Sequence, residues 1–338
     1  MPRILSGIQP TGDMHLGNYV GAVRNWVELQ HEFDAFYPVV DLHAITLPYD
    51  RDTLREKTLE VAALLLAAGL DPEVCTVFVQ SHVPEHTELN WLLNHIATVG
   101  ELRRMTQFKA KAAQGGEGAL PAGYFNYPVL QAADILVYHA DLVPVGEDQR
   151  QHLELTRDVA ERFNHRFGPT FTLPEAYIPR VGGRIMDLQH PDAKMSKSAD
   201  SPNGTILLLD PPDAIRRKVR SAVTDSGREV LARPDKPAIT NLLELFSVAT
   251  GKAVGELEQA YAGRGYGDFK RDLGDVLVSW TAPVHDRYAE LRGDPDRLAA
   301  VLERGAERAR SIARATLAQV RERMGLLPRR TPPAEPSR

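Results

Sequence analysis

The chain has 338 residues, of which 43% are hydrophobic and 25% charged, so its composition is that of a globular protein and excludes a disordered chain. The net charge of -5 argues against a protein that coats nucleic acid without selectivity, because such binding depends on a basic surface. Cys75 is the only cysteine, which excludes an intramolecular disulfide and a cysteine-built metal site, so we expect a reducing compartment, the cytoplasm.

Short apolar segments alternate with longer helical patterns in the first half of the chain, and this order predicts a parallel sheet covered by helices. We expect strands at 3–6, 35–41, 75–80 and 142–145, and helices at 18–30, 54–70, 86–98 and 148–166. A basic helical segment at 102–111 and a Gly-rich loop at 114–123 look like an insertion. The most apolar run, 61–70, is far shorter than the roughly 20 residues that cross a bilayer, so no membrane contact is expected.

After residue 211 the strand signals end, and an appended helical region is expected, with helices at 213–223, 239–250, 254–261, 266–280 and 297–324. From 303 to 330, eight arginines stand against three glutamates, a net of five positive charges. This stretch is either a solvated helix face or a local basic patch for nucleic acid. The tail at 327–338 is rich in Pro and Arg and is expected to be disordered.

The first chemical motif spans residues 6–18, where a strand ends in a turn-rich loop that opens a helix at Gly17. The free N–H groups and the positive end of such a helix favour an anion, and Gly17 permits close approach of a base or ribose. His15 is suited to donate a hydrogen bond to charge that develops on an α-phosphate. The alternative is a plain turn that Asn18 caps.

The second motif, Lys-Met-Ser-Lys-Ser at 194–198, places two cations three residues apart on a Ser-rich loop. Phosphoryl and adenylyl transfer need cations around the departing phosphate charge, and Lys194 and Lys197 suit that task. The alternative is an exposed surface loop. Because the two motifs occur in this order about 180 residues apart, the sequence favours a nucleotide site.

These motifs resemble the HIGH and KMSKS signatures of class I aminoacyl-tRNA synthetases, with His-Leu-Gly-Asn at 15–18 in the first place. Asn18 departs from the final His of the general pattern, but a Gly-Asn ending is usual in the tryptophanyl branch. Three further segments, 100–109, 132–136 and 143–149, are similar to bacterial-type tryptophanyl-tRNA synthetases. The resemblance extends over nearly the whole chain, from Ile4 to Leu326.

The resemblance implies an α/β fold, with a Rossmann-like parallel sheet that has helices on both faces and an appended all-helical C-terminal domain. It implies a catalytic domain at 1–205, whose insertion at 100–140 contributes to the amino-acid site and a dimer contact. Residues 206–326 would then form a helical region that binds the tRNA anticodon, with the Arg-rich helix among the tRNA contacts.

The implied activity is that of a tryptophan–tRNA ligase of the cytoplasm. It would activate L-tryptophan with ATP, with Mg²⁺ on the phosphates, and pass the adenylate to tRNA(Trp). A homodimer is implied. The resemblance implies no membrane contact, no DNA binding and no metal bound by protein side chains alone.

The resemblance also implies roles for individual residues. The catalytic residues would be His15, Lys194, Lys197 and Ser198. ATP would contact Gln9, Pro10, Thr11, Gly17, Asn18, Gly146, Glu147, Asp148, Ile185 and the residues Lys194, Met195, Ser196, Lys197 and Ser198. Tryptophan would contact Asp134, which accepts the indole N–H, and Leu5, Gly7, His43, Gln107, Tyr127, Val143, Val145 and Gln149. A structural role is the alternative for His43, and a position on the helix surface is the alternative for Asp134.

Three other functions fit the sequence less well. The tyrosyl enzyme places a Tyr at the end of the first strand, where this chain has Leu5, and Leu5 with Val143 and Val145 suits an indole better. A shorter nucleotidyltransferase would lack the helical appendix, and a synthetase-like paralogue with a binding or regulatory role would not require intact catalytic motifs. Gln131 departs from the Met that is usual in the indole pocket, and residues 199–202 depart from the usual Asp-Pro after KMSKS.

Overall fold

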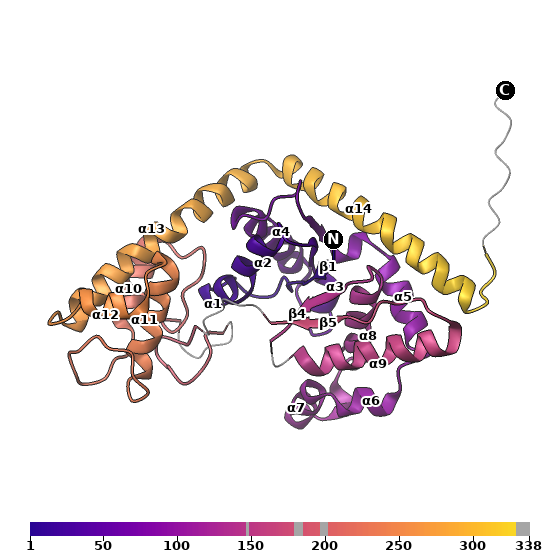
Figure 1. Ribbon diagram of the computed structural model, residues 1–338, viewed down its shortest axis with the longest axis horizontal. Coiled ribbons are helices and arrows are strands. Elements are labelled where there is room, and N and C mark those ends of the chain that lie inside the picture. The colour runs from indigo at the N-terminus through magenta and orange to yellow at the C-terminus, as the bar shows by residue number, and fades with distance from the viewer. Residues whose placement is uncertain (147–148, 179–184, 197–201, 329–338) are drawn as a thin grey trace.

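The computed structural model describes residues 1–146, 149–178, 185–196 and 202–328. It contains a parallel β-sheet covered by helices and, to one side, a helical body (Figure 1). Two long helices, α13 (Tyr266–Gly293) and α14 (Pro295–Arg323), form a bent arm across both parts. The expected α/β class with an appended helical region is confirmed.

Five parallel strands form the sheet in the order β3-β2-β1-β4-β5. Their bounds are β1 Arg3–Leu5, β2 Asp34–Val39, β3 Thr76–Val79, β4 Leu142–Pro144 and β5 Glu175–Tyr177. The strand order reverses beside β1, whose Ile4 pairs with Ala35 of β2 and with Leu142 of β4. A ligand crevice is therefore expected at the carboxyl ends of β1 and β4. The first four strands agree with the sequence, whereas β5 was not predicted.

Successive side chains of β1 and β3 enter two separate cores. Ile4 and Val77 are buried in the core that α2, α4 and the helical body cover. Leu5 and Phe78 are buried in the opposite core, with residues of α5, α8, α9 and α14. Because strand side chains alternate between faces, burial of both sets explains why these segments read as continuous apolar runs.

The helices around the sheet follow the expected order with small shifts at their ends. A continuous helical segment begins with α1 (Leu16–Asn18), passes through a π-helical turn η1 (Tyr19–Val23) and ends with α2 (Arg24–Leu29). The others are α3 (Asp41–Ala44), α4 (Arg51–Ala67), the 3-10 turn η2 (Gln80–His82), α5 (Glu85–Leu93), α6 (Val99–Arg104), α7 (Thr106–Gly115), the 3-10 turn η3 (Glu117–Ala119), α8 (Ala122–Leu136) and α9 (Arg150–Phe167). The single helix expected at 102–111 is instead divided at Met105, whose ψ of 128° is extended.

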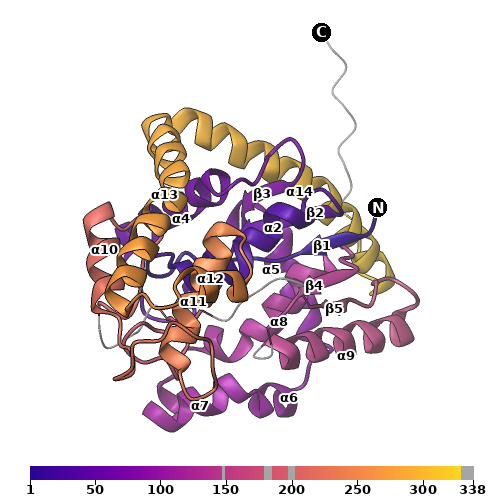
Figure 2. The same ribbon diagram turned by 60° about the vertical axis from the view of Figure 1, so that its left-hand side comes forward.

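The helical body contains α10 (Pro212–Ser221), α11 (Pro237–Thr250), α12 (Val254–Ala260) and the first part of α13 (Figure 2). α13 is longer than the expected 266–280 because it continues through Pro283. Thr281 donates its hydroxyl to the Leu277 carbonyl, and Val284 is buried in the core that the body shares with the sheet. Packing thus outweighs the helix-breaking tendency of proline.

Among the helices that the structure describes, we find none with the length and apolar content needed to cross a membrane.

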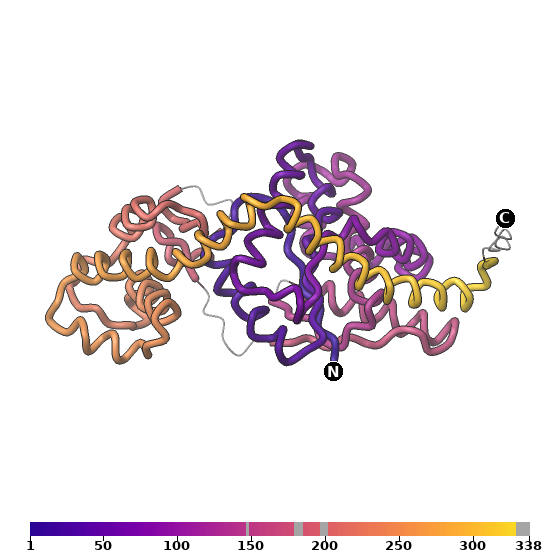
Figure 3. The backbone as a smooth tube through the Cα atoms, turned by 90° about the horizontal axis from the view of Figure 1, so that it is seen from above, coloured from indigo at the N-terminus to yellow at the C-terminus, as the bar shows by residue number. Residues whose placement is uncertain are grey.

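α14 leaves the helical body and runs back over the sheet (Figure 3). Gly305 lies directly on β3, where an added Cβ would be 1.9 Å from the carbonyl oxygen of Val77. Ala306 and Ala309 are fully buried in the same helix, and such small side chains permit close approach. The segment expected as one helical region, 206–326, therefore does not pack as one unit, because its last helix contacts the sheet.

Six arginines of α14 have partners within the chain. Arg308 pairs with Asp34 at 2.9 Å, and Arg314 with Glu85 at 3.1 Å. Further contacts join Arg304 to Glu73, Arg321 to Glu88, and Arg310 and Arg323 to the backbone carbonyls of His82 and Phe167. The carboxylates offset part of the positive charge, so α14 is not a simple solvated face; the arginines at 329–330 lie outside the described residues.

Candidate functional site

A cavity of about 310 Å³ opens at the carboxyl ends of β1 and β4, where the strand order reverses. All nine residues expected at the amino-acid site line it: Leu5, Gly7, His43, Gln107, Tyr127, Asp134, Val143, Val145 and Gln149. The remaining lining residues are Ser6, Gln9, Pro38, Val40, Gln131, Ile135 and Pro144. The structure thus brings together residues from the first and second halves of the sheet in one cavity.

One face of α8 forms a wall of this cavity. Tyr127, Gln131, Asp134 and Ile135 all line it, and their spacing of four, seven and eight residues places them on the same side of a helix. Asp134 is 3% exposed, so the alternative of a helix-surface carboxylate is wrong.

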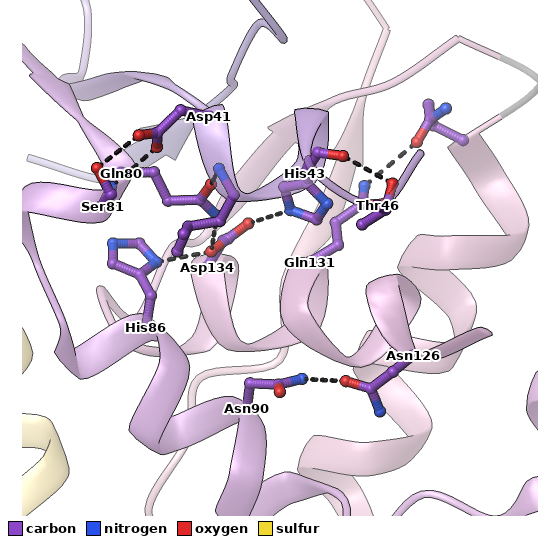
Figure 4. A network of polar contacts seen from close by, with 12 residues as sticks. Asp41, His43, Thr46, Gln80, Ser81, His86, Asn90, Asn126, Gln131 and Asp134 are labelled. Carbon is purple, nitrogen blue, oxygen red and sulfur yellow. Dashed lines mark hydrogen bonds and ion pairs between the residues drawn. The ribbon is translucent and has the colours of Figure 1, made fainter. Parts of the chain in front are cut away.

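Buried donors surround the Asp134 carboxylate (Figure 4). Its Oδ2 lies 2.7 Å from Nε2 of His43, and its Oδ1 lies 2.6 Å from Nδ1 of His86. Gln80 donates its amide to Oδ1 at 2.7 Å. His86 and Gln80 were not predicted from the sequence, because neither belongs to a motif and each acts through contact with another residue.

The Asp134 carboxyl group is ionised at neutral pH. Burial by itself raises its pKa, but hydrogen bonds and charge attraction from His43 and His86 outweigh burial and lower the pKa to about 2. A buried carboxylate is stable only when such donors replace water. Asp134 therefore acts as an acceptor in the cavity, and not as an acid.

A second polar network joins other residues that line the cavity to His152. The Tyr127 hydroxyl donates to Oε1 of Gln107 at 2.7 Å and lies 2.9 Å from Nε2 of His152. Oε1 of Gln149 lies 3.2 Å from Nδ1 of His152 and accepts from Gln131 at 3.3 Å. His152 was missed by sequence analysis, although its spacing of three residues from Gln149 is typical of neighbours in a helical turn.

The first motif forms a capped helix start beside the end of β1. Nδ1 of His15 accepts the Asn18 backbone N–H at 3.2 Å, and Oδ1 of Asn18 accepts the His15 N–H at 3.4 Å. The two side chains thus form a reciprocal capping box, which orients the first turn of the helix. His15, and not Asn18 as the alternative proposed, is the capping residue.

The two motifs fold against each other. A Cβ added to Gly17 would lie 3.4 Å from Cβ of Met195, and the Leu16 N–H donates to the Ile206 carbonyl at 2.9 Å. His15 also pairs with Leu207 in an antiparallel bridge. Segments nearly 180 positions apart in the chain therefore share one surface, as the sequence predicted.

The other residues expected at the ATP site are placed as follows. Gln9 lines the cavity, Thr11 and Gly146 are exposed, and Asn18 and Ser196 are half-buried. Pro10, Ile185 and Met195 are buried. Glu147, Asp148, Lys197 and Ser198 lie outside the described residues.

Lys194 lies in a short hairpin that contacts the helical body. Lys194 bridges Met186 on the opposite arm, and the Met195 N–H donates to the Ile185 carbonyl at 3.1 Å. Asn241 of α11, 3% exposed, accepts the Met186 N–H at 2.9 Å and donates to the Met186 carbonyl at 3.0 Å. One buried amide thus joins the helical body to the hairpin that carries Lys194.

We expect Asn241→Leu to destabilise the chain by about 2 kcal/mol, because both Met186 backbone groups lose their partner. Urea unfolding monitored by circular dichroism measures this change. Gln259→Leu, at an exposed position of α12, is the matched control. Equal midpoints for the two variants would show that the Asn241 contacts add nothing to stability.

Comparisons with known proteins agree over almost the whole chain. The family model of class I tRNA synthetases (W and Y) matches residues 1–280. Tryptophan–tRNA ligase 2 of Streptomyces avermitilis is 56% identical over 97% of this chain and 98% of its own. Tryptophan–tRNA ligase of Leifsonia xyli subsp. xyli is 53% identical over 96% of this chain and 97% of its own.

Solved structures give the same result. Tryptophanyl-tRNA synthetase from Mycoplasma pneumoniae has a TM-score of 0.87 at 37% identity, covering 96% of this chain and 98% of that chain. The Campylobacter jejuni synthetase, solved with ADP and tryptophan, has a TM-score of 0.82 at 35% identity, covering 96% of this chain and 100% of that chain.

Proposed function

Because the chain belongs to the class I tRNA synthetase family (W and Y), we propose that it joins L-tryptophan to tRNA(Trp) at the expense of ATP. An oxygen of the tryptophan carboxylate bonds to the α-phosphorus of ATP, and the bond to pyrophosphate breaks. A hydroxyl of the terminal ribose of tRNA then attacks the carbonyl carbon of the adenylate, and AMP leaves. Neither step requires a side-chain nucleophile, so the chain's residues act by positioning and charge stabilisation.

The ionised, buried Asp134 at the wall of a cavity that Leu5, Val143 and Val145 also line is the observation that carries this proposal. Its carboxylate accepts the indole N–H, and Leu5, Val143 and Val145 contact the flat ring. A buried acceptor left without its donor is costly, so the site favours a substrate that supplies one. The Leu5 side chain supplies no hydroxyl partner for a phenol, which argues against tyrosine.

The facing motifs support the ATP side of the proposal. Gly17 and Asn18 lie in the first turn of the helix, which favours phosphate, and Gln9 and Thr11 lie in the loop before it. Gly146 follows β4. We assign Pro10, Glu147, Asp148 and Ile185 to the ribose and base, and Lys194, Met195, Ser196, Lys197 and Ser198 to the phosphates. In the described part of the chain, no three His, Cys, Asp or Glu side chains gather in a set that holds a metal ion. We assign Mg²⁺ to the ATP phosphates, whose charge it would neutralise.

Two His15 variants separate its capping role from its proposed contact with the α-phosphate. We expect both His15→Asn and His15→Ala to lower kcat for pyrophosphate exchange by about 10²-fold, because neither replaces the imidazole donor. Asparagine still caps the helix, so only His15→Ala should lose about 1 kcal/mol of stability. His31→Asn, at an exposed position, serves as the control. Full activity in His15→Asn would remove His15 from the catalytic residues.

Amino-acid-dependent exchange of labelled pyrophosphate into ATP tests the proposed function. We expect exchange with tryptophan and not with tyrosine. Exchange with tyrosine instead would reassign the specificity. No exchange with any amino acid would favour a paralogue with a binding or regulatory role.

We propose further that the chain acts in the cytoplasm and that its helical region, 206–326, contacts the tRNA anticodon. The arginines of α14 contribute to tRNA binding only to the extent that tRNA phosphates compete with the carboxylates paired to them. Increasing salt should then weaken tRNA binding, because phosphate contacts release counterions.

An exposed apolar surface supports a homodimer. Trp91 is 76% exposed and Tyr49 56%. The segments that carry Trp91 and Tyr49 both lie beside the start of α8. Asn90, next to Trp91, donates to Asn126 of α8. A Cβ at Gly123 of α8 would lie 3.9 Å from the methyl group of Thr46, which is close to Tyr49 in sequence. Apolar surface of this kind marks protein interfaces. Sedimentation of Trp91→Glu against the wild-type chain tests the assignment, and an unchanged mass would contradict it.

A further inference from the structure

The two oxygens of Asp134 are held in different ways. Oδ1 accepts from Gln80 at 2.7 Å and from His86 at 2.6 Å, whereas Oδ2 accepts from His43 at 2.7 Å. Gln80 and His86 are fully buried behind the cavity wall, and of the three donors only His43 lines the cavity. A carboxylate oxygen offers about two lone pairs, so protein donors fill Oδ1, and Oδ2 retains one acceptor position beside His43.

His86 is itself held from behind. Its Nε2 lies 2.6 Å from the hydroxyl of Tyr138, which is fully buried and stacks on Phe36 with ring centroids 5.0 Å apart. His86 thus contacts Asp134 through Nδ1 and the Tyr138 hydroxyl through Nε2, so buried groups hold both ring nitrogens. The ring therefore has little freedom to turn away from Asp134.

Gln80 links the Asp134 carboxylate to α3, the helix that carries His43. Its Oε1 accepts the Leu42 N–H at 3.1 Å while its amide donates to Asp134. Leu42 precedes His43 in α3, so one side chain places both the carboxylate and the helix that carries the remaining donor.

We propose that His86 and Gln80 are positioning residues for amino-acid selection, an inference that rests on the proposed function. They fix Oδ1 so that Oδ2 faces the cavity as the acceptor for the indole N–H. Selection for a ring N–H then depends on residues that never touch the substrate. Loss of either donor lets the carboxylate turn, and the penalty for a substrate without the N–H falls.

The test compares kcat/KM in pyrophosphate exchange for tryptophan and for β-(benzothienyl)alanine, in which sulfur replaces the ring N–H. We expect the full-length wild-type chain to favour tryptophan by about 10⁴-fold. His86→Leu and Gln80→Met should each reduce this ratio by about tenfold or more. His86→Asn places an amide donor near the position of Nδ1 and should retain most of the ratio. His95→Leu, at an exposed position, is the matched control.

Each outcome decides the question. Equal losses for both substrates, with the ratio unchanged in His86→Leu and Gln80→Met, would give these residues a purely structural role and overturn the inference alone. If His86→Leu does not fold, the other two variants still test the inference. His86→Asn must retain the tryptophan preference, and Gln80→Met must lose it. Absence of exchange with tryptophan in the wild-type chain would overturn the proposed function and this inference with it.

Discussion

Asp134→Ala is expected to lower kcat/KM for tryptophan in pyrophosphate exchange by on the order of 10³-fold, because the site is built to hydrogen-bond the indole N–H and the substrate loses that acceptor. The substitution removes the proposed indole acceptor and leaves the buried donors of His43, His86 and Gln80 without their partner. The first effect acts on tryptophan alone, whereas the second lowers stability.

The two effects separate experimentally. Asp134→Asn keeps an acceptor oxygen and the shape of the side chain, so it should fold better than Asp134→Ala and still lose most of its activity with tryptophan. The KM for ATP should change little in either variant. Asp52→Ala, at an exposed position of α4, is the control. Near wild-type kcat/KM in Asp134→Ala would assign the indole N–H to another acceptor.

Gly305→Ala is expected to destabilise the chain by about 3 kcal/mol, because an added methyl group overpacks a close contact. Its Cβ would meet the Val77 carbonyl oxygen at 1.9 Å, so α14 must move away from β3. Chemical denaturation measures the loss. Gly255→Ala in α12, where an added Cβ meets nothing within 4 Å, should instead be neutral or stabilising by up to about 1 kcal/mol. Similar stability in the two variants would show that α14 moves away from β3 at little cost.

The sequence predicted strands such as β2 and β3 because burial on both faces leaves a continuous apolar run. β5 escaped prediction because it is a three-residue edge strand, Glu175–Tyr177, with no buried residue. The end of α13 was placed too early because Pro283 is a breaker by local rules, and its packing on the sheet region is not visible locally. The packing of α14 on β3 depends on contacts between segments that are far apart in the chain. The periodicity of a local segment does not predict such contacts.

The site shows the same division. Residues within motifs or beside them, such as His15 and Asp134, were found because their chemistry is local or because the resemblance marked them. His86, Gln80 and His152 were not found, since each matters through a partner that lies far away in sequence or one helical turn away. The sequence likewise did not predict that arginines of α14 form ion pairs with carboxylates such as those of Asp34 and Glu85.

The contact of α14 with β3 also bears on how the chain is made. β3 is an edge strand of the sheet, and the helix that packs on it is complete only at Arg323. Until the ribosome has synthesised α14, β3 lacks the helix that packs on it. An open strand edge can pair with other chains. Truncation within α14 should therefore yield aggregates, and not a shorter folded enzyme.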